Sequence, residues 1–204
     1  SLGTSNFLVD RDQRTTTWSV EYQLDAESPM LNGRLLAYRN KVEMDESRVS
    51  DDRYDSTELL VRGINLSNLS MIGDIELLYG IDGYREEFDA SRGGTNRPEP
   101  PDAETDVWGA FIQARMPLAD TWILELGARY DRFETEAKNL NADSSDSNLS
   151  PSVALIWENS DWLKLTLRHD RAFRAPSAEA LYSTGTHFCM GPGFCNTFLP
   201  NPDL

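Results

Sequence analysis

The run WGAFIQARMPLADTWILELGARYD, residues 108–131, contains two stretches in which apolar and polar side chains alternate. The apolar positions of the first stretch are Trp108, Ala110, Ile112, Ala114 and Met116, and those of the second are Trp122, Leu124, Leu126, Ala128 and Tyr130. A period of two residues is that of a β-strand with one apolar and one polar face. Because only residues 117–121 separate the stretches, they predict a β-hairpin.

Three further pairs of strand-like stretches occur along the chain. The strands are predicted at residues 17–25, 31–44, 56–68, 73–85, 149–157 and 162–173. Short turns lie within the pairs, whereas long polar segments lie between them and are predicted as loops at residues 45–55, 86–105 and 137–148. No helical period competes with this pattern. The sequence therefore predicts an all-β fold of about eight strands in an antiparallel meander, with every long loop at the same end.

This arrangement is typical of a transmembrane β-barrel, in which short turns lie on one side of the membrane and long loops on the other. Tryptophans occur near both ends of the predicted strands, as two interfacial belts require. We therefore expect six side chains to face lipid, namely those of Trp108, Ile112, Leu124, Leu126, Leu165 and Leu167. A soluble all-β protein with half-buried antiparallel sheets gives the same alternation and is the alternative.

Charge and residue types exclude several functions. The formal net charge of −15 argues against nucleic-acid binding, because binding by counterion release needs clustered Lys and Arg. No apolar run approaches the roughly 18 residues that a membrane-spanning helix needs. The chain shows no nucleophile with a base partner, no phosphate-binding glycine loop and no zinc-site spacing. We therefore expect no enzymatic activity and no catalytic cofactor.

The last segment, residues 174–204, is predicted to be a long loop. It contains His187, one of only two histidines, together with both cysteines of the chain, Cys189 and Cys195. Long loops that carry rare and reactive residue types are common functional sites. The two cysteines lie six residues apart in a turn-rich bend, which suggests a local disulfide in an oxidising compartment. Two unpaired thiols are the alternative.

Several runs resemble the carboxy-terminal barrel of TonB-dependent outer-membrane receptors of Gram-negative bacteria: WILELGARYDRF at 122–133, LSPSVALIW at 149–157 and LKLTLRHDRAFRAPSAEALY at 163–182. Within that superfamily, a Phe-Arg-Ala-Pro box, a histidine and an Asn-Pro-Asn-Leu-type box together resemble the haem and haemoprotein receptors. The first box is Phe173, Arg174, Ala175 and Pro176, and the second is Asn201, Pro202, Asp203 and Leu204. Asp203 replaces the commoner Asn, and the cysteines are not part of the family pattern.

The resemblance implies that His187, which lies between the boxes, is an axial ligand of haem iron. Haem would be the transported ligand, and the apolar surface for its porphyrin would come from Tyr182, Phe188, Met190 and Phe198. A solvated loop histidine is the alternative for His187. We expect the two boxes to position the loop rather than to contact the ligand, because their prolines stop strand pairing.

The resemblance also implies a location and partners. Receptors of this family have about twenty-two strands around an amino-terminal plug, so residues 1–204 are expected to be part of a barrel domain, without the plug that contacts the TonB complex. The expected location is the bacterial outer membrane, with lipid around the barrel and residues 174–204 outside the cell. Other expectations within transport are a receptor for a ferric siderophore or for zinc. A passive porin or an adhesin barrel is the alternative from another class.

Overall fold

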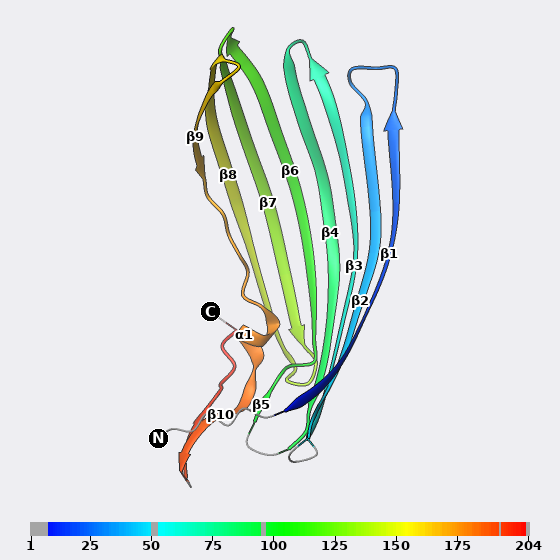
Figure 1. The fold of residues 1–204 in the computed structure, drawn as a ribbon, viewed down its shortest axis with the longest axis vertical. Coiled ribbons are helices and arrows are strands. Elements are labelled where there is room, and N and C mark those ends of the chain that lie inside the picture. Colours follow the sequence, from blue (N-terminus) through cyan, green and yellow to red (C-terminus); the bar gives the residue numbers. More distant parts are fainter. Residues whose placement is uncertain (1–7, 50–52, 95–96, 192, 203–204) are drawn as a thin grey trace.

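The computed structural model describes residues 8–49, 53–94, 97–191 and 193–202. Eight strands form one antiparallel sheet in the order β1-β2-β3-β4-β6-β7-β8-β9, so each of these strands pairs with the next one along the chain (Figure 1). Their bounds are Val9–Asp25, Asn32–Arg48, Arg53–Ile72, Ile75–Arg92, Ala103–Ala119, Trp122–Ala137, Ala142–Ser160 and Leu163–Asp170. The predicted all-β meander of eight strands is confirmed.

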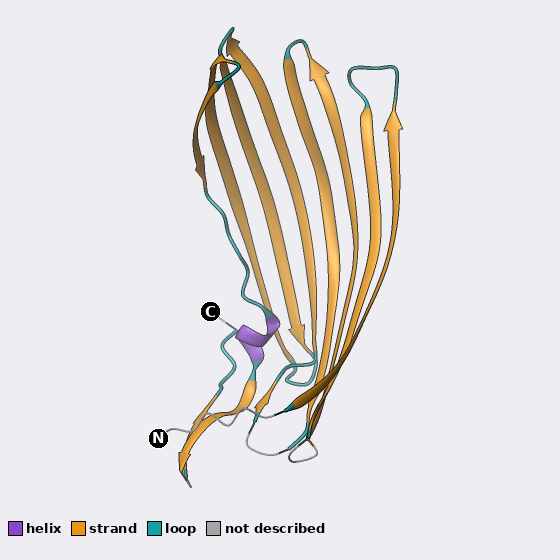
Figure 2. Cartoon of the chain, in the orientation of Figure 1, coloured by secondary structure: helices purple, strands orange, loops and turns teal. Residues whose placement is uncertain are grey.

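The two ends of the sheet differ. The connections β1–β2, β3–β4, β6–β7 and β8–β9 lie at one end, and the longest connection, residues 93–102 between β4 and β6, lies at the other, called the long-connection end below (Figure 1). The expected division into short turns and long loops does not hold throughout, because residues 138–141 between β7 and β8 are fewer than residues 26–31 between β1 and β2. The small elements are also at the long-connection end, including the single helix in the described part, drawn in purple in Figure 2. They are β5 (Pro98–Glu99), α1 (Ala178–Tyr182), β10 (Thr184–Gly191) and β11 (Phe194–Thr197). Within the described residues, no helix is long and apolar enough to cross a membrane.

The strands are longer than the sequence pattern predicts. Half of the predicted loop residues 86–105 belong to β4 and β6, and the predicted loops at 45–55 and 137–148 are shortened in the same way. The final strand, β9, is instead shorter, because it ends at Asp170 and not at residue 173. Polar residues on both faces hide the period of two, but they have partners across the sheet. Arg85 contacts Glu104 and Asp106, both at 2.7 Å.

One face of the sheet is apolar from β1 to β8. A single row of cross-strand partners illustrates this: Tyr22, Leu35, Leu66, Ile81, Ala110, Tyr130 and Leu149. Five of the side chains expected to face lipid are exposed here, from 42% for Leu126 to 76% for Leu167, and Leu124 is half-buried. No described element packs across this face as a second sheet would. This argues against the soluble sandwich, and the face is called the apolar face below.

The opposite face of the same sheet is polar. Arg129 of β7 donates two hydrogen bonds to Asp82 of β4, at 2.7 and 2.8 Å, and a third to Asp131. Arg115 and Glu125 form another pair at 2.9 Å. One apolar and one polar face on each strand is the pattern of a barrel wall with lipid outside and a polar interior.

Candidate functional site

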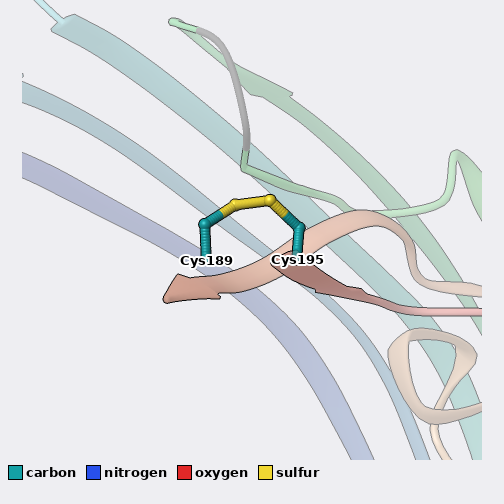
Figure 3. Close-up of a disulfide and its surroundings, with 2 residues drawn as sticks. All are labelled: Cys189 and Cys195. Carbon is teal, nitrogen blue, oxygen red and sulfur yellow. A yellow bond between two sulfur atoms is a disulfide. The ribbon is translucent and has the colours of Figure 1, made fainter. Parts of the chain in front are cut away.

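The segment predicted as a long loop, residues 174–204, is folded over much of its length. Ser177 caps α1, because its hydroxyl accepts a hydrogen bond from the backbone N–H of Ala180 at 3.2 Å. After the helix, β10 and β11 form a hairpin in which Cys189 and Cys195 are directly opposite and joined by a disulfide (Figure 3). The segment is therefore a structured excursion at the long-connection end of the sheet.

Tyr182 does not fit its expected role as a surface for the porphyrin. Its exposed fraction is 0%, and it packs with Ala137 and Leu181 in a small core that Leu140 and Ala142 extend. Its hydroxyl makes no hydrogen bond within the described part of the chain. Burial raises the pKa of this hydroxyl above its ordinary value, and the charge of Asp143 adds to the effect. Tyr182 therefore holds α1 against the sheet.

His187 is exposed on β10. Its ring contacts that of Phe198 in an edge-to-face arrangement, with the ring centroids 4.8 Å apart and the ring planes at 63°. No described residue hydrogen-bonds to the imidazole, so both ring nitrogens are open to a ligand. Met190 and Phe198 are exposed on the same excursion, at 83% and 38%. The structure thus brings two of the expected ligand-binding residues, His187 and Phe198, into contact. Met190 lies three positions along the same strand, and no contact joins it to His187 in the described residues. The side chain of Phe188 lies outside the described residues.

The two sequence boxes lie close to the wall of the sheet. The ring of Phe173 packs against Phe133 of β7, with centroids 5.7 Å apart. At the other end of the excursion, Asn201 N donates to Leu181 O at 2.7 Å, and Pro202 O accepts from Ser144 Oγ of β8 at 2.9 Å. These contacts hold both ends of the excursion against the sheet. They are consistent with the expectation that the two boxes position the segment rather than contact the ligand.

The remaining box residues contribute less to this anchoring. Arg174 is exposed, whereas Ala175 and Pro176 are half-buried. Asp203 and Leu204 lie outside the described residues. A helix begins directly after the first box, at Ala178.

A second anchor, which the sequence did not predict, connects the β10–β11 hairpin, which carries His187, to β3. Arg97 makes two hydrogen bonds to the carboxylate of Asp55, at 2.5 and 2.7 Å. The backbone O of Arg97 in turn accepts from Thr186 N at 3.1 Å, and β5 pairs with the start of β10. Asp55 therefore holds Arg97, and Arg97 in turn holds Thr186, the residue next to His187. Nothing in the sequence pattern links Asp55 to Arg97, because 42 positions separate them.

Asp55 and Arg97 should make the position of the hairpin dependent on pH. The side chains of Asp55 and Arg97 are 15% and 21% exposed. Hydrogen bonds from Arg97 lower the pKa of Asp55 below its ordinary value, since they favour the charged carboxylate. A lowered pKa means that the stabilisation is present above the unfolded pKa of about 3.9 and is lost as the pH falls through the folded value.

We therefore expect amide hydrogen exchange in residues 184–197 of the full-length receptor to accelerate as the pH is lowered below about 4, after correction for the intrinsic exchange rate. Arg97→Gln should give the faster exchange already at neutral pH. The control is Asp45→Asn, which removes a carboxylate whose pKa Tyr54 and Ser56 lower at the same end of the sheet. Equal acceleration by Asp45→Asn and Arg97→Gln would show that Asp55 does not hold the hairpin specifically.

The disulfide gives a separate prediction. Peptide mapping of the non-reduced receptor should recover Cys189 and Cys195 in one linked fragment, because their Cα atoms are 4.0 Å apart across the hairpin. The cross-link closes a short loop, so we expect it to stabilise the hairpin by about 2 kcal/mol. Cys189→Ser combined with Cys195→Ser should then speed exchange in the hairpin and leave the eight-strand sheet unchanged. Two free thiols in the untreated protein would contradict this prediction.

The chain is similar to proteins named for heme or hemin. Heme/hemopexin utilization protein C of Haemophilus influenzae is 32% identical over 213 residues, covering 100% of this chain and 29% of that protein. A hemin receptor of Yersinia enterocolitica is 26% identical over 214 residues, covering 100% and 30%. The hemophore receptor HasR of Serratia marcescens, solved as a double mutant with its hemophore HasA and heme, superposes with a TM-score of 0.82 at 16% identity, covering 98% and 35%.

The chain spans about 30% of the length of the two curated relatives, so it corresponds to a part of each. The similarity to HasR, at 16% identity, supports the fold alone. The profile of the family described as TonB dependent receptor-like, beta-barrel matches residues 2–204. A match over nearly the whole chain shows that this protein belongs to the TonB-dependent receptor-like β-barrel family.

Proposed function

We propose that the chain is the site-bearing part of an outer-membrane receptor that binds haem or a haemoprotein at its extracellular loops and passes haem inward with energy supplied through TonB. The observation that carries the proposal is the open imidazole of His187, which lies on an anchored hairpin at the long-connection end of the sheet. Two relatives named for heme and hemin support the same ligand. Membership of the family favours an energised receptor over a passive porin or an adhesin.

The chemistry of the hairpin suits haem. Haem iron binds a neutral imidazole nitrogen, and the porphyrin needs apolar contacts around that bond. His187 supplies the nitrogen, and the ring of Phe198 in contact with it supplies apolar surface. Met190, exposed on the same strand, is a further apolar side chain of the hairpin. The disulfide and the Asp55–Arg97 pair restrain the hairpin before ligand arrives, which lowers the entropic cost of binding. Because the ligating imidazole must be deprotonated, acid should weaken binding.

Other parts of the full receptor complete this function. We expect the second axial ligand to come from the plug or from another loop outside this chain. The plug also carries the segment that contacts the TonB complex, and the apolar face lies against membrane lipid. Haem is cargo in this scheme, so the receptor performs no catalysis.

Absorption titrations of the purified full-length receptor test this function. Hemin should give a saturable shift of the Soret band, whereas a ferric siderophore and Zn²⁺ should show no saturable binding. Deleting the TonB-contacting segment of the plug should stop haem uptake by cells and leave hemin binding by the purified receptor unchanged. Saturable binding of the siderophore or of zinc, with none of hemin, would replace haem as the ligand.

A further inference from the structure

Three arginines form a continuous row on the apolar side of the sheet. Arg39 of β2 is the direct cross-strand partner of Arg62 of β3, which is the partner of Arg85 of β4. They lie on the same side as the apolar row described above, because side chains alternate along each strand and the residues two and four positions away are Ala37 and Leu35 in β2. The row is thus the first charged level beyond the apolar residues, on the side of the long connections.

A hollow of about 560 Å³ surrounds this row. Trp18 borders it next to Arg39, its direct cross-strand partner. Trp108 borders it on the far side, where its ring covers Gly83; a Cβ on Gly83 would lie 2.5 Å from Trp108 Cε3. Both tryptophans are largely exposed, at 70% and 60%. Exposed tryptophan beside an apolar surface is typical of the headgroup level of a membrane.

The charges in the row are only partly neutralised by the protein. Like charges directly opposite each other destabilise a sheet, so three adjacent arginines need compensation. Arg85 contacts Glu104 and Asp106, and Arg62 uses Nη2 for Glu87. A guanidinium has five N–H donors, so Arg62 keeps donors free. Arg39 forms no ion pair with any acid in the described ranges. Arg39 and Arg62 therefore lack a full set of anionic partners.

We propose that Arg39 and Arg62, between Trp18 and Trp108, bind the phosphate of a membrane lipid whose acyl chains lie along the apolar face. Guanidinium groups bind phosphate oxygens in a planar two-bond geometry. Basic side chains at the edge of a membrane-embedded surface also attract anionic headgroups. The net charge of the chain is −15, so long-range attraction does not bring anions to this protein and the contact must be local. The proposal rests on the membrane orientation in the proposed function and adds a lipid site to it.

The test is equilibrium binding of fluorescent phosphatidic acid to the detergent-solubilised full-length receptor, with a diacylglycerol of the same chains as the phosphate-free probe. Phosphatidic acid should bind at least about tenfold more tightly than diacylglycerol, and Arg39→Gln with Arg62→Gln should remove most of that difference. The matched control is Arg14→Gln with Arg132→Gln, which removes two arginines from the same side of the sheet outside the hollow. It should change the affinity by less than about twofold. The single variants Arg39→Gln and Arg62→Gln give the same comparison if the double variant does not assemble.

Three results would overturn the lipid site. They are equal losses in the two double variants, equal binding of diacylglycerol and phosphatidic acid, and displacement of the lipid by millimolar inorganic phosphate, which would identify a site for free phosphate. Hemin titration of the same samples separates the two proposals. Lost lipid binding with intact hemin binding supports the lipid site, whereas a wild-type receptor that binds lipid and not hemin rejects only the proposed function.

Discussion

Hemin should bind about 100-fold more weakly to the full-length receptor carrying His187→Ala than to the unaltered receptor. Removing a partner that only supports a metal ligand costs about 10- to 100-fold in affinity, so loss of an axial ligand should reach at least the upper end of that range. The contacts of the porphyrin with Met190 and Phe198 remain and keep some binding. Absorption titration at neutral pH measures both affinities.

The other histidine provides the control for this variant. His169 is exposed on β9, and its cross-strand partner is Val153 on the apolar face. His169→Ala should therefore leave the hemin affinity within about twofold of the unaltered value, as is usual for an exposed side chain away from the site. Assembly of the barrel should be normal in both variants, since β10 lies outside the eight-strand sheet and the side chain of His169 is exposed on β9. Equal affinities of the His187 and His169 variants would remove His187 from the site.

Tyr182→Ala should release the excursion from the sheet without unfolding the barrel. Truncation of a fully buried aromatic side chain costs about 3–5 kcal/mol, and Tyr182 has an exposed fraction of 0%. The loss is local, because the core around Tyr182 contains few residues beyond Ala137 and Leu181. Amide exchange in residues 178–197 should rise strongly, and hemin affinity should fall because His187 is no longer held in one place.

Tyr182→Phe separates the packing of this side chain from its hydroxyl. The hydroxyl is buried without a hydrogen-bond partner among the described residues, and such a group costs about 1–3 kcal/mol. The Phe variant should thus be as stable as the unaltered protein or more stable, with the same hemin affinity. If Tyr182→Phe loosened the excursion as much as Tyr182→Ala, a polar contact of the hydroxyl and not packing would hold α1.

The alternation of apolar and polar residues predicted the strands. It also predicted their order, because strands that are neighbours in the sequence pair with each other in the sheet. The strand ends could not be predicted, since residues such as Arg85, Glu104 and Asp106 satisfy one another across strands and leave no apolar period. The short helix α1 did leave a signal. Ser177 is a favourable N-cap residue, and Ala, Glu and Leu, which follow it, favour helix.

The site was predicted in part. His187, Met190 and Phe198 stood out because rare and apolar residue types occurred together in a segment expected to be a loop, and their role in binding stays a prediction. The burial of Tyr182 depends on Ala137, which is distant in sequence, and the support from Asp55 depends on a pairing over 42 positions. Contacts of this kind arise from the tertiary fold, so no local pattern of residues contains them.

The electron paramagnetic resonance spectrum of the ferric haem-loaded full-length receptor tests most directly whether His187 binds the iron. The unaltered receptor should give a low-spin signal, because two strong axial ligands hold the iron. His187→Ala should convert this signal to a high-spin one, and added imidazole should restore the low-spin form by occupying the vacated position. A low-spin spectrum in His187→Ala that matches the unaltered receptor without imidazole would contradict ligation by His187.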